Sequence, residues 1–241
     1  MSRVDPAIAV LRFEAIVDDS NLDIIHRGDA ARALHDLGHP DPTHGLRAAA
    51  VDIHLSPKER FEAARVIADV DRIDGLSVLV ALAKDDAFAG RYRAEASTVV
   101  NSLDSAVGVE VFAYLAASIT LRADRRLDAA IALNMVDSSR GHAAFVDIAS
   151  TVSNGSIAIS AAVKVGYVDK SSGLRLLTRL ARNQVFEHAI RARAVKEIRR
   201  VDALLGMREG RILSRDLEEL IDRGGLTDGQ MRSIRKIMRE L

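Results

Sequence analysis

The sequence predicts an all-α protein, a right-handed α-solenoid of about six helix-pair repeats with atypical terminal helices. Three observations lead to this fold class. The chain repeats itself every 32 or 33 residues, the recurring residues have helical spacing, and helix start and stop signals recur at matching places. Self-similarity at a period of this length is typical of stacked helical repeats. The repeats are anchored on one aliphatic position, found at Leu37, Val70, Leu103, Val136, Val168 and Val201.

Two further columns lie on the same helix face as this anchor. An alanine lies seven residues before each anchor and an aliphatic residue lies three before it, which places all three on one face. We expect the three columns to form the core, with alanine allowing close approach of neighbouring helices. The alanines are Ala30, Ala63, Ala96, Ala129, Ala161 and Ala194, and the aliphatic residues are Leu34, Ile67, Val100, Leu133, Val165 and Ile198.

Arginine and aspartate form two polar columns in the same register. The arginine lies ten residues before the anchor, at Arg27, Arg60, Arg93, Arg126 and Arg191, with Ala158 in the fifth repeat. The aspartate lies one residue after it, at Asp71, Asp104, Asp137, Asp169 and Asp202, with Gly38 in the first repeat. We expect each Asp to cap the following helix and each Arg to reach a neighbouring turn Asp or carbonyl. Five copies at one offset favour a structural ladder over an active site.

The elements follow in order from the N-terminus. A helix is expected over residues 5–18, because Asp5 can cap it and Pro6 suits its first position. The next pair is expected over residues 27–37 and 43–55. Ser56-Pro-Lys-Glu59 then forms a capping box that opens another first helix, and 71–75 is expected to be a turn. Later first helices are expected over 90–103, 124–136, 156–168 and 187–201, and second helices over 76–84, 106–119, 139–151 and 172–183.

The pattern changes after Asp202. Gly210 and Arg211 occupy apolar positions, so a poor second helix is expected there, followed by a separate helix over 214–223. Gly224-Gly225 ends that helix, and Thr227 can cap a final one. The predicted division is therefore a repeat array over 1–213 and capping helices over 214–241, within one continuous solenoid.

Composition limits the chemistry of the chain. The sequence has no Cys, which excludes disulfides and thiolate sites, and no apolar run long enough to span a membrane. The N-terminus does not resemble a signal peptide, so we expect a cytoplasmic protein without a membrane partner. Net charge is zero, but residues 1–174 carry −6 and residues 175–241 carry +6. This asymmetry favours either a polar partner for the basic end or solvated helix faces whose charges vary freely.

Alignment of the second helices on their recurrent glycine predicts which side chains share a face. The glycines are Gly75, Gly108, Gly141, Gly173 and Gly206. One column holds Ser77, Glu110, Ala143, Arg175 and Arg208, a second holds Ala81, Tyr114, Asp147 and Arg179, and a third holds Lys84, Ala117, Ser150, Arg182 and Arg215. From these columns we select a candidate binding surface consisting of Tyr114, Asp147, Arg175, Arg179 and Arg182.

No catalytic, cofactor or metal site is expected. His35 and His39 have metal-ligand spacing only within a continuous helix, and Gly38 predicts that the helix ends between them. A Ser/His/acid triad cannot be argued from His142 or His188, because nothing in the sequence activates either residue. Gly224-Gly225 lacks the strand–loop–helix context of a phosphate loop.

The pattern of residues 60–71, which residues 27–38 and 126–137 repeat, resembles the HEAT family, in particular its short-repeat branch also seen in phycobilisome lyases. The resemblance covers about residues 5–210. It maps the family's ladder Arg and Asp onto the two polar columns above, from which Gly38 and Ala158 depart. It also implies that the second helices line a concave face and that this face binds protein.

The function expected on this basis is a non-enzymatic scaffold or adaptor that binds a protein partner. The alternative is a DNA-binding protein, similar to the HEAT-like DNA glycosylases, with Arg175, Arg179, Arg182, Arg208 and Arg215 on phosphates. A neutral overall charge, the absence of Trp and the nine aromatic residues count against DNA. A bilin lyase rests on the resemblance alone.

Overall fold

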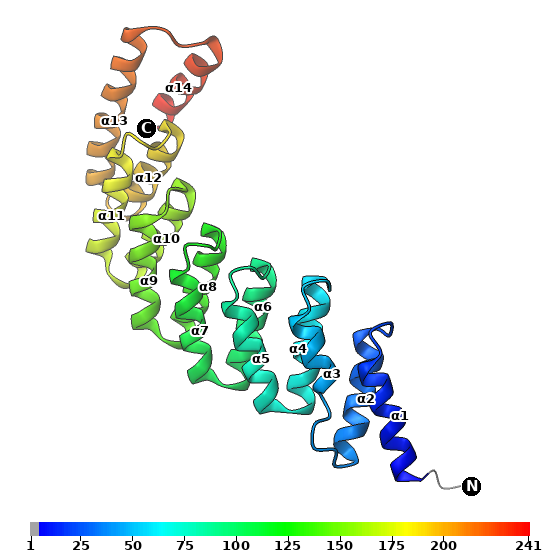
Figure 1. Cartoon of the computed structure of the whole chain (residues 1–241). Coiled ribbons are helices and arrows are strands. Elements are labelled where there is room, and N and C mark those ends of the chain that lie inside the picture. Colours follow the sequence, from blue (N-terminus) through cyan, green and yellow to red (C-terminus); the bar gives the residue numbers. More distant parts are fainter. Residues whose placement is uncertain (1–4) are drawn as a thin grey trace. The chain divides into compact units, whose positions relative to one another are not determined.

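A computed structural model describes residues 5–241, and within that range the protein is all-α, with fourteen helices and no strand. The chain forms two compact units, Met1–Arg125 and Arg126–Leu241. Within each unit, helices that follow one another in sequence pack side by side (Figure 1). The protein is thus a helical-repeat protein of the α-solenoid class, as the sequence predicts.

The helices of the N-terminal unit are α1 (Pro6–Asp18), α2 (Ile24–Asp36), α3 (His44–Val51), α4 (Pro57–Val70), α5 (Arg72–Lys84), α6 (Gly90–Leu103) and α7 (Ser105–Ala117). Helix α8 (Ala123–Val136) contains the division between the units. The C-terminal unit continues with α9 (Ser138–Thr151), α10 (Gly155–Val168), α11 (Lys170–Arg182), α12 (His188–Val201), α13 (Ala203–Arg223) and α14 (Asp228–Glu240).

Helix starts follow the sequence signals closely. Asp5 caps α1 through the Ala7 amide, with Pro6 at the first position. Ser56 and Glu59 form both hydrogen bonds of a capping box at α4, and Thr227 with Gln230 forms a second box at α14. These contacts satisfy amides that the helix itself leaves unpaired.

Each first helix from α4 to α12 is joined to its second helix by a single aspartate. The Asp71 amide donates to the Ile67 carbonyl at 2.7 Å, which ends α4, and the Asp71 carboxylate accepts from the Ile73 and Asp74 amides, which starts α5. The expected turn over 71–75 is therefore wrong, since α5 already begins at Arg72. One residue suffices because it is both the C-cap of one helix and the N-cap of the next.

The recurrent glycine lies just past this corner, where the two helices of a pair cross. A Cβ built on Gly75 would lie 2.1 Å from the Ala68 Cα, and one built on Gly173 would lie 2.4 Å from the Gly166 Cα. Real Cβ atoms essentially never approach backbone this closely. The glycine column is therefore required by the close crossing of the helices.

The core contains two of the three predicted apolar columns. Every alanine of the column is buried, and so is every aliphatic residue three positions before the anchor. The prediction that the anchor column is part of the core is wrong, because Val70 is the only anchor that is buried. Leu37, Val136, Val168 and Val201 are 41–65% exposed. The anchors from Val70 to Val201 are all the last residues of their helices, where burial varies from 8% exposed at Val70 to 65% exposed at Val168.

The C-terminal elements also differ from expectation. Residues 203–223 form one continuous helix, α13, so Gly210 and Arg211 do not interrupt it. Gly210 is buried within α13, and a Cβ there would meet the Arg199 Nη2, the end of a flexible side chain, at 3.2 Å. The predicted division between residues 213 and 214 falls inside α13 and does not separate two elements.

Candidate functional site

The arginine column forms hydrogen bonds to backbone carbonyls of the preceding second helix. Nε of Arg27, Arg60, Arg93 and Arg191 donates to the carbonyl ten residues earlier, at 2.8–3.0 Å. Arg93 is 1% exposed, and burial lowers the pKa of Arg27 while Asp18 and Asp19 oppose that effect. A buried guanidinium that donates to helix C-terminal carbonyls stabilises the junction between repeats.

The acidic partners of these arginines are not the aspartates at the corners. Arg93 pairs with Asp86 at 2.9 Å, Arg126 pairs with Asp147 at 3.0 Å, and Arg191 pairs with Asp216. Asp71, Asp104, Asp137, Asp169 and Asp202 each cap the following helix. The Asp169 carboxylate accepts from the Ser172 and Ser171 hydroxyls and amides, which lowers its pKa. The expected Arg-to-carbonyl contact is present, and the two columns do not pair with each other.

The second helices carry the candidate binding residues, and in the N-terminal unit the only one is Tyr114, on α7. Tyr114 is exposed, its hydroxyl donates to the Lys84 carbonyl at 3.2 Å, and the Lys84 Nζ lies 5.7 Å from its ring centroid. Ser77, Ala81, Glu110 and Ala117 are also exposed. This surface presents small side chains around one aromatic ring.

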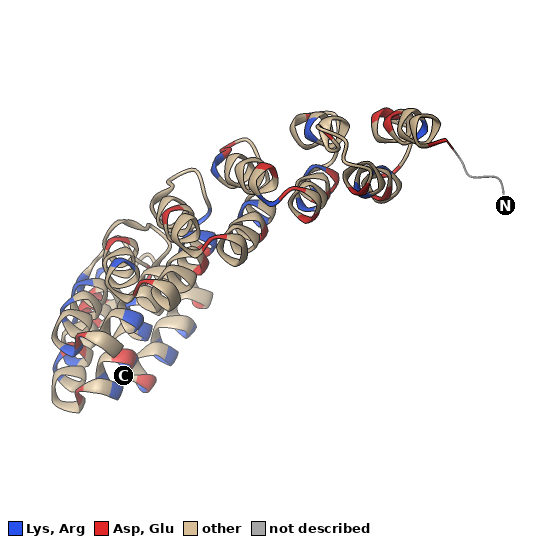
Figure 2. Cartoon of the chain, turned by 90° about the horizontal axis from the view of Figure 1, so that it is seen from below, with Lys and Arg blue, Asp and Glu red and all other residues tan. Residues whose placement is uncertain are grey.

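In the C-terminal unit the aligned second-helix columns hold eight exposed residues, and five of them are arginines. We define the second-helix face of this unit by these exposed residues on α9, α11 and α13, which are Ala143, Asp147, Ser150, Arg175, Arg179, Arg182, Arg208 and Arg215. Lys and Arg recur along the helices of this unit, with Asp and Glu between them (Figure 2). The Arg179 Nη2 donates to the Ala149 carbonyl at 3.3 Å, and the Arg175 Nη2 donates to the Ser172 hydroxyl at 3.1 Å. Contacts between successive second helices make this face continuous.

Glu209 is the acidic centre of this face. It is 2% exposed, and its carboxylate accepts from the Arg182 Nε at 2.7 Å and from the Arg182 Nη2 at 2.6 Å. The Arg208 Nη2 also lies 3.3 Å from it. These contacts lower the pKa of Glu209 against the opposing effect of burial, and the hydrogen bond from Arg182 has the largest effect. The Arg182 guanidinium is thus paired with a buried carboxylate.

Glu209 is not among the predicted site residues, although the sequence contains a signal for it. The residue three positions after the column glycine is apolar in the other repeats, at Val78, Val111, Ala144 and Leu176. A carboxylate at an otherwise apolar position requires a buried partner. Comparison of this column across repeats predicts an ion pair at Glu209.

His39, in the loop after α2, and His44, at the start of α3, form a polar cluster in the N-terminal unit. His39 lies beyond the end of α2, and its Nε2 is 2.9 Å from Glu14; the His44 Nε2 is 2.9 Å from Asp18. Burial lowers the pKa of His44, but the hydrogen bonds to Asp18 and Asp41 outweigh it, so the net pKa is raised. His35 lies on α2 and is separate from this cluster.

Residues 5–241 contain no group of three or more His, Asp or Glu side chains arranged to hold a metal ion. No helix in this range is long and apolar enough to cross a membrane. Comparison of the chain with models of protein families, with curated protein sequences and with solved structures gives no match. The following proposals therefore rest on the residues themselves.

Proposed function

We propose that the protein is a non-enzymatic scaffold or adaptor that binds an acidic surface of a protein partner through the second-helix face of its C-terminal unit. The observation that carries this proposal is the continuous row of exposed arginines on α11 and α13, with the buried Glu209 among them. Rigid helices present these side chains at fixed spacing, which suits recognition of carboxylates on another protein.

The row of exposed arginines with the buried Glu209 among them favours a protein partner over DNA. A duplex-binding surface uses cations that are free to neutralise phosphates, and affinity grows with their number. On this face Glu209 neutralises Arg182 and lies beside Arg208, and Asp147 pairs with Arg126. Alternating charges of this kind suit a protein surface of mixed sign. The resemblance to HEAT-like repeats supports the same assignment.

The structure determines which arginines are suitable for mutagenesis. Replacement of Arg182 by Glu would place a second carboxylate against the buried Glu209 and would destabilise α13. Arg175 and Arg179 are exposed and make only one long or local hydrogen bond each. The double variant Arg175→Glu/Arg179→Glu therefore tests binding without disturbing the fold.

The experiment is affinity purification of the tagged full chain from its native cells, followed by identification of proteins that are retained. The double variant is expected to lose the partner while its circular dichroism stays unchanged. The matched control is Lys164→Glu/Arg193→Glu, which makes the same charge change on the first helices α10 and α12. Equal loss in both double variants would contradict a specific role for the second-helix face.

A titration with a random 20-base-pair duplex distinguishes the DNA-binding alternative from protein binding. Binding in low salt that weakens steeply as salt rises, and that is lost in Arg175→Glu/Arg179→Glu, would replace the protein-binding proposal. The protein-binding proposal predicts that the wild-type chain binds the duplex no better than the control variant Lys164→Glu/Arg193→Glu does.

A further inference from the structure

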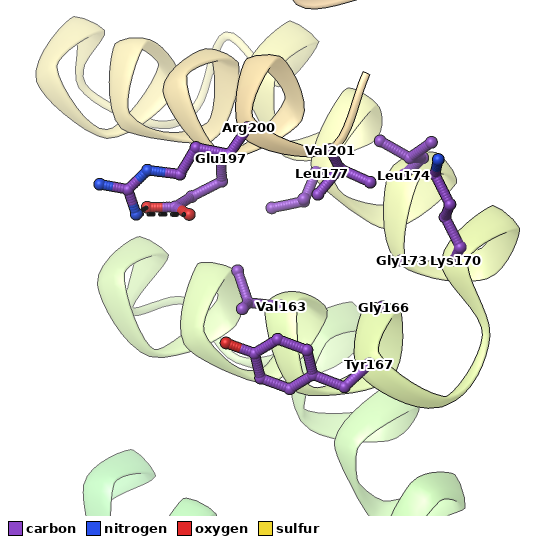
Figure 3. Close-up of a pocket in the computed structure, with 10 residues that line it drawn as sticks. All are labelled: Val163, Gly166, Tyr167, Lys170, Gly173, Leu174, Leu177, Glu197, Arg200 and Val201. Carbon is purple, nitrogen blue, oxygen red and sulfur yellow. Dashed lines mark hydrogen bonds and ion pairs between the residues drawn. The ribbon is translucent and has the colours of Figure 1, made fainter. Parts of the chain in front are cut away.

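A pocket opens on a different face of the C-terminal unit, between the first helices α10 and α12 and above α11. Its volume is about 280 Å³. Val163, Leu174, Leu177 and Val201 give it apolar walls. Figure 3 shows the Tyr167 ring on the α10 side and the Glu197–Arg200 pair on the α12 side.

One position that lines the pocket lacks a side chain in this repeat. Seven residues before the column glycine, the other repeats carry Ala68, Asn101, Asn134 and Arg199, whereas this repeat carries Gly166. Gly166 faces Gly173, so the floor of the pocket is two backbones. A Cβ on Gly166 would meet nothing closer than the Gly173 Cα at 3.7 Å, so the helix crossing itself does not require this glycine.

The rim of the pocket also differs from an ordinary apolar crevice. Tyr167 is 78% exposed, which is a large aromatic surface left in contact with water. Lys170 lines the pocket, is exposed, and has no ion-pair partner among the described residues. Asp169 beside it is engaged with the Ser171 and Ser172 amides at the start of α11.

Arg200, the second cation of the rim, is only partly neutralised. Glu197 accepts two hydrogen bonds from Arg200, at 2.9 and 3.0 Å, and both come from Nη1. The Arg200 side chain is 74% exposed, so the rest of its guanidinium faces solvent. Lys170 and Arg200 together give the rim an excess of positive charge over Glu197.

We infer that this pocket anchors one large aliphatic side chain of an acidic segment of a partner protein. The volume lies just below the range of pockets for whole small-molecule ligands, and an aliphatic side chain is a smaller occupant that matches the Val and Leu walls. The exposed cations fit carboxylates on the residues that flank the anchor. This site is separate from the second-helix face, so either proposal can fail without the other.

The test is an NMR titration of the full chain, followed through the methyl signals of Val163 and Val201. The probe is the blocked tripeptide acetyl-Glu-Leu-Glu-amide. Acetyl-Glu-Ala-Glu-amide lacks the anchor, and acetyl-Lys-Leu-Lys-amide reverses the charge. We expect saturable shifts with the first peptide and at least tenfold weaker binding of the other two, because a buried leucine side chain and the charge match each contribute to affinity.

Two variants complete the test. Gly166→Asn places in the pocket the residue that two other repeats carry there and is expected to weaken binding at least tenfold, whereas Gly166→Ala adds one carbon and serves as its control. Tyr167→Ala removes an exposed wall and should also weaken binding without affecting the fold. The inference is overturned if the leucine peptide shifts these signals no more than the alanine peptide, or if both Gly166→Asn and Tyr167→Ala bind it as wild type does.

Discussion

Gly166 on α10 and Gly173 on α11 face each other but differ in how much space a Cβ would have. Gly173→Ala and Gly166→Ala make the same chemical change on the two sides of one contact. A Cβ on Gly173 would lie 2.4 Å from the Gly166 Cα and 2.6 Å from its nitrogen, whereas a Cβ on Gly166 would have its nearest neighbour at 3.7 Å. We expect the first variant to be destabilised and the second to be stabilised.

The magnitudes follow from two opposing effects. Alanine in place of glycine inside a helix stabilises by about 1 kcal/mol. Overpacking costs about 1–3 kcal/mol, and a clash with backbone belongs at the upper end, about 3 kcal/mol. Gly173→Ala should therefore lose about 2 kcal/mol of local unfolding free energy. Gly166→Ala should gain between about 0.5 and 1 kcal/mol.

Native-state hydrogen exchange of the α11 amides is the suitable assay, because parts of a repeat protein open separately and a single melting curve averages over them. A loss of about 2 kcal/mol corresponds to roughly thirtyfold faster exchange in Gly173→Ala. Equal exchange in the two variants would refute the conclusion that the close crossing of the helices requires the glycine column.

Further predictions concern the core and the titrating groups. Ala96→Leu should cost about 1–3 kcal/mol in urea unfolding, because Ala96 is fully buried; an unchanged midpoint would contradict this. The lowered pKa of Glu209 stabilises the fold above its unfolded pKa of about 4.3, and this stabilisation is lost as pH falls through the folded pKa. The stability difference between wild type and Glu209→Gln should therefore shrink below about pH 4. His44 has a raised pKa, so its contribution is full below about pH 6.5 and is lost as pH rises through the folded pKa. Asp18→Asn should remove much of that pH dependence, as urea midpoints at pH 5.5 and 8.5 would show. Amides of residues 157–163 should exchange faster than those of 60–66, because the fifth repeat has Ala158 in place of the ladder arginine.

The periodicity of the sequence predicts the helix pairs, the capping aspartates and two core columns, because these features depend on local spacing. It does not predict how fully a position is covered. Val168 has core spacing but ends α10, where it is 65% exposed. Helix continuity across Gly210 also escaped prediction, because α13 packs against α12 and such packing outweighs the cost of about 1 kcal/mol that one glycine imposes on a helix.

The candidate binding surface could likewise be predicted only in part from the sequence. Alignment of the repeats selects Arg175, Arg179 and Arg182 as exposed neighbours, and all three are exposed in the structure. It does not reveal that Arg182 is bound to Glu209, because the two residues lie 27 positions apart and meet only when α11 and α13 pack together. The pocket beside Gly166 likewise depends on the packing of three helices.

Photo-crosslinking in cells measures whether the second-helix face of the C-terminal unit binds a protein. The photoreactive amino acid p-benzoylphenylalanine is placed at residue 175 on α11 or, as a control, at residue 193 on α12. The proposal predicts an adduct from residue 175 that resists nuclease, is destroyed by protease and is absent when Arg179→Glu is added. Adducts of equal yield from both positions, or an adduct from residue 175 that nuclease removes, would contradict it.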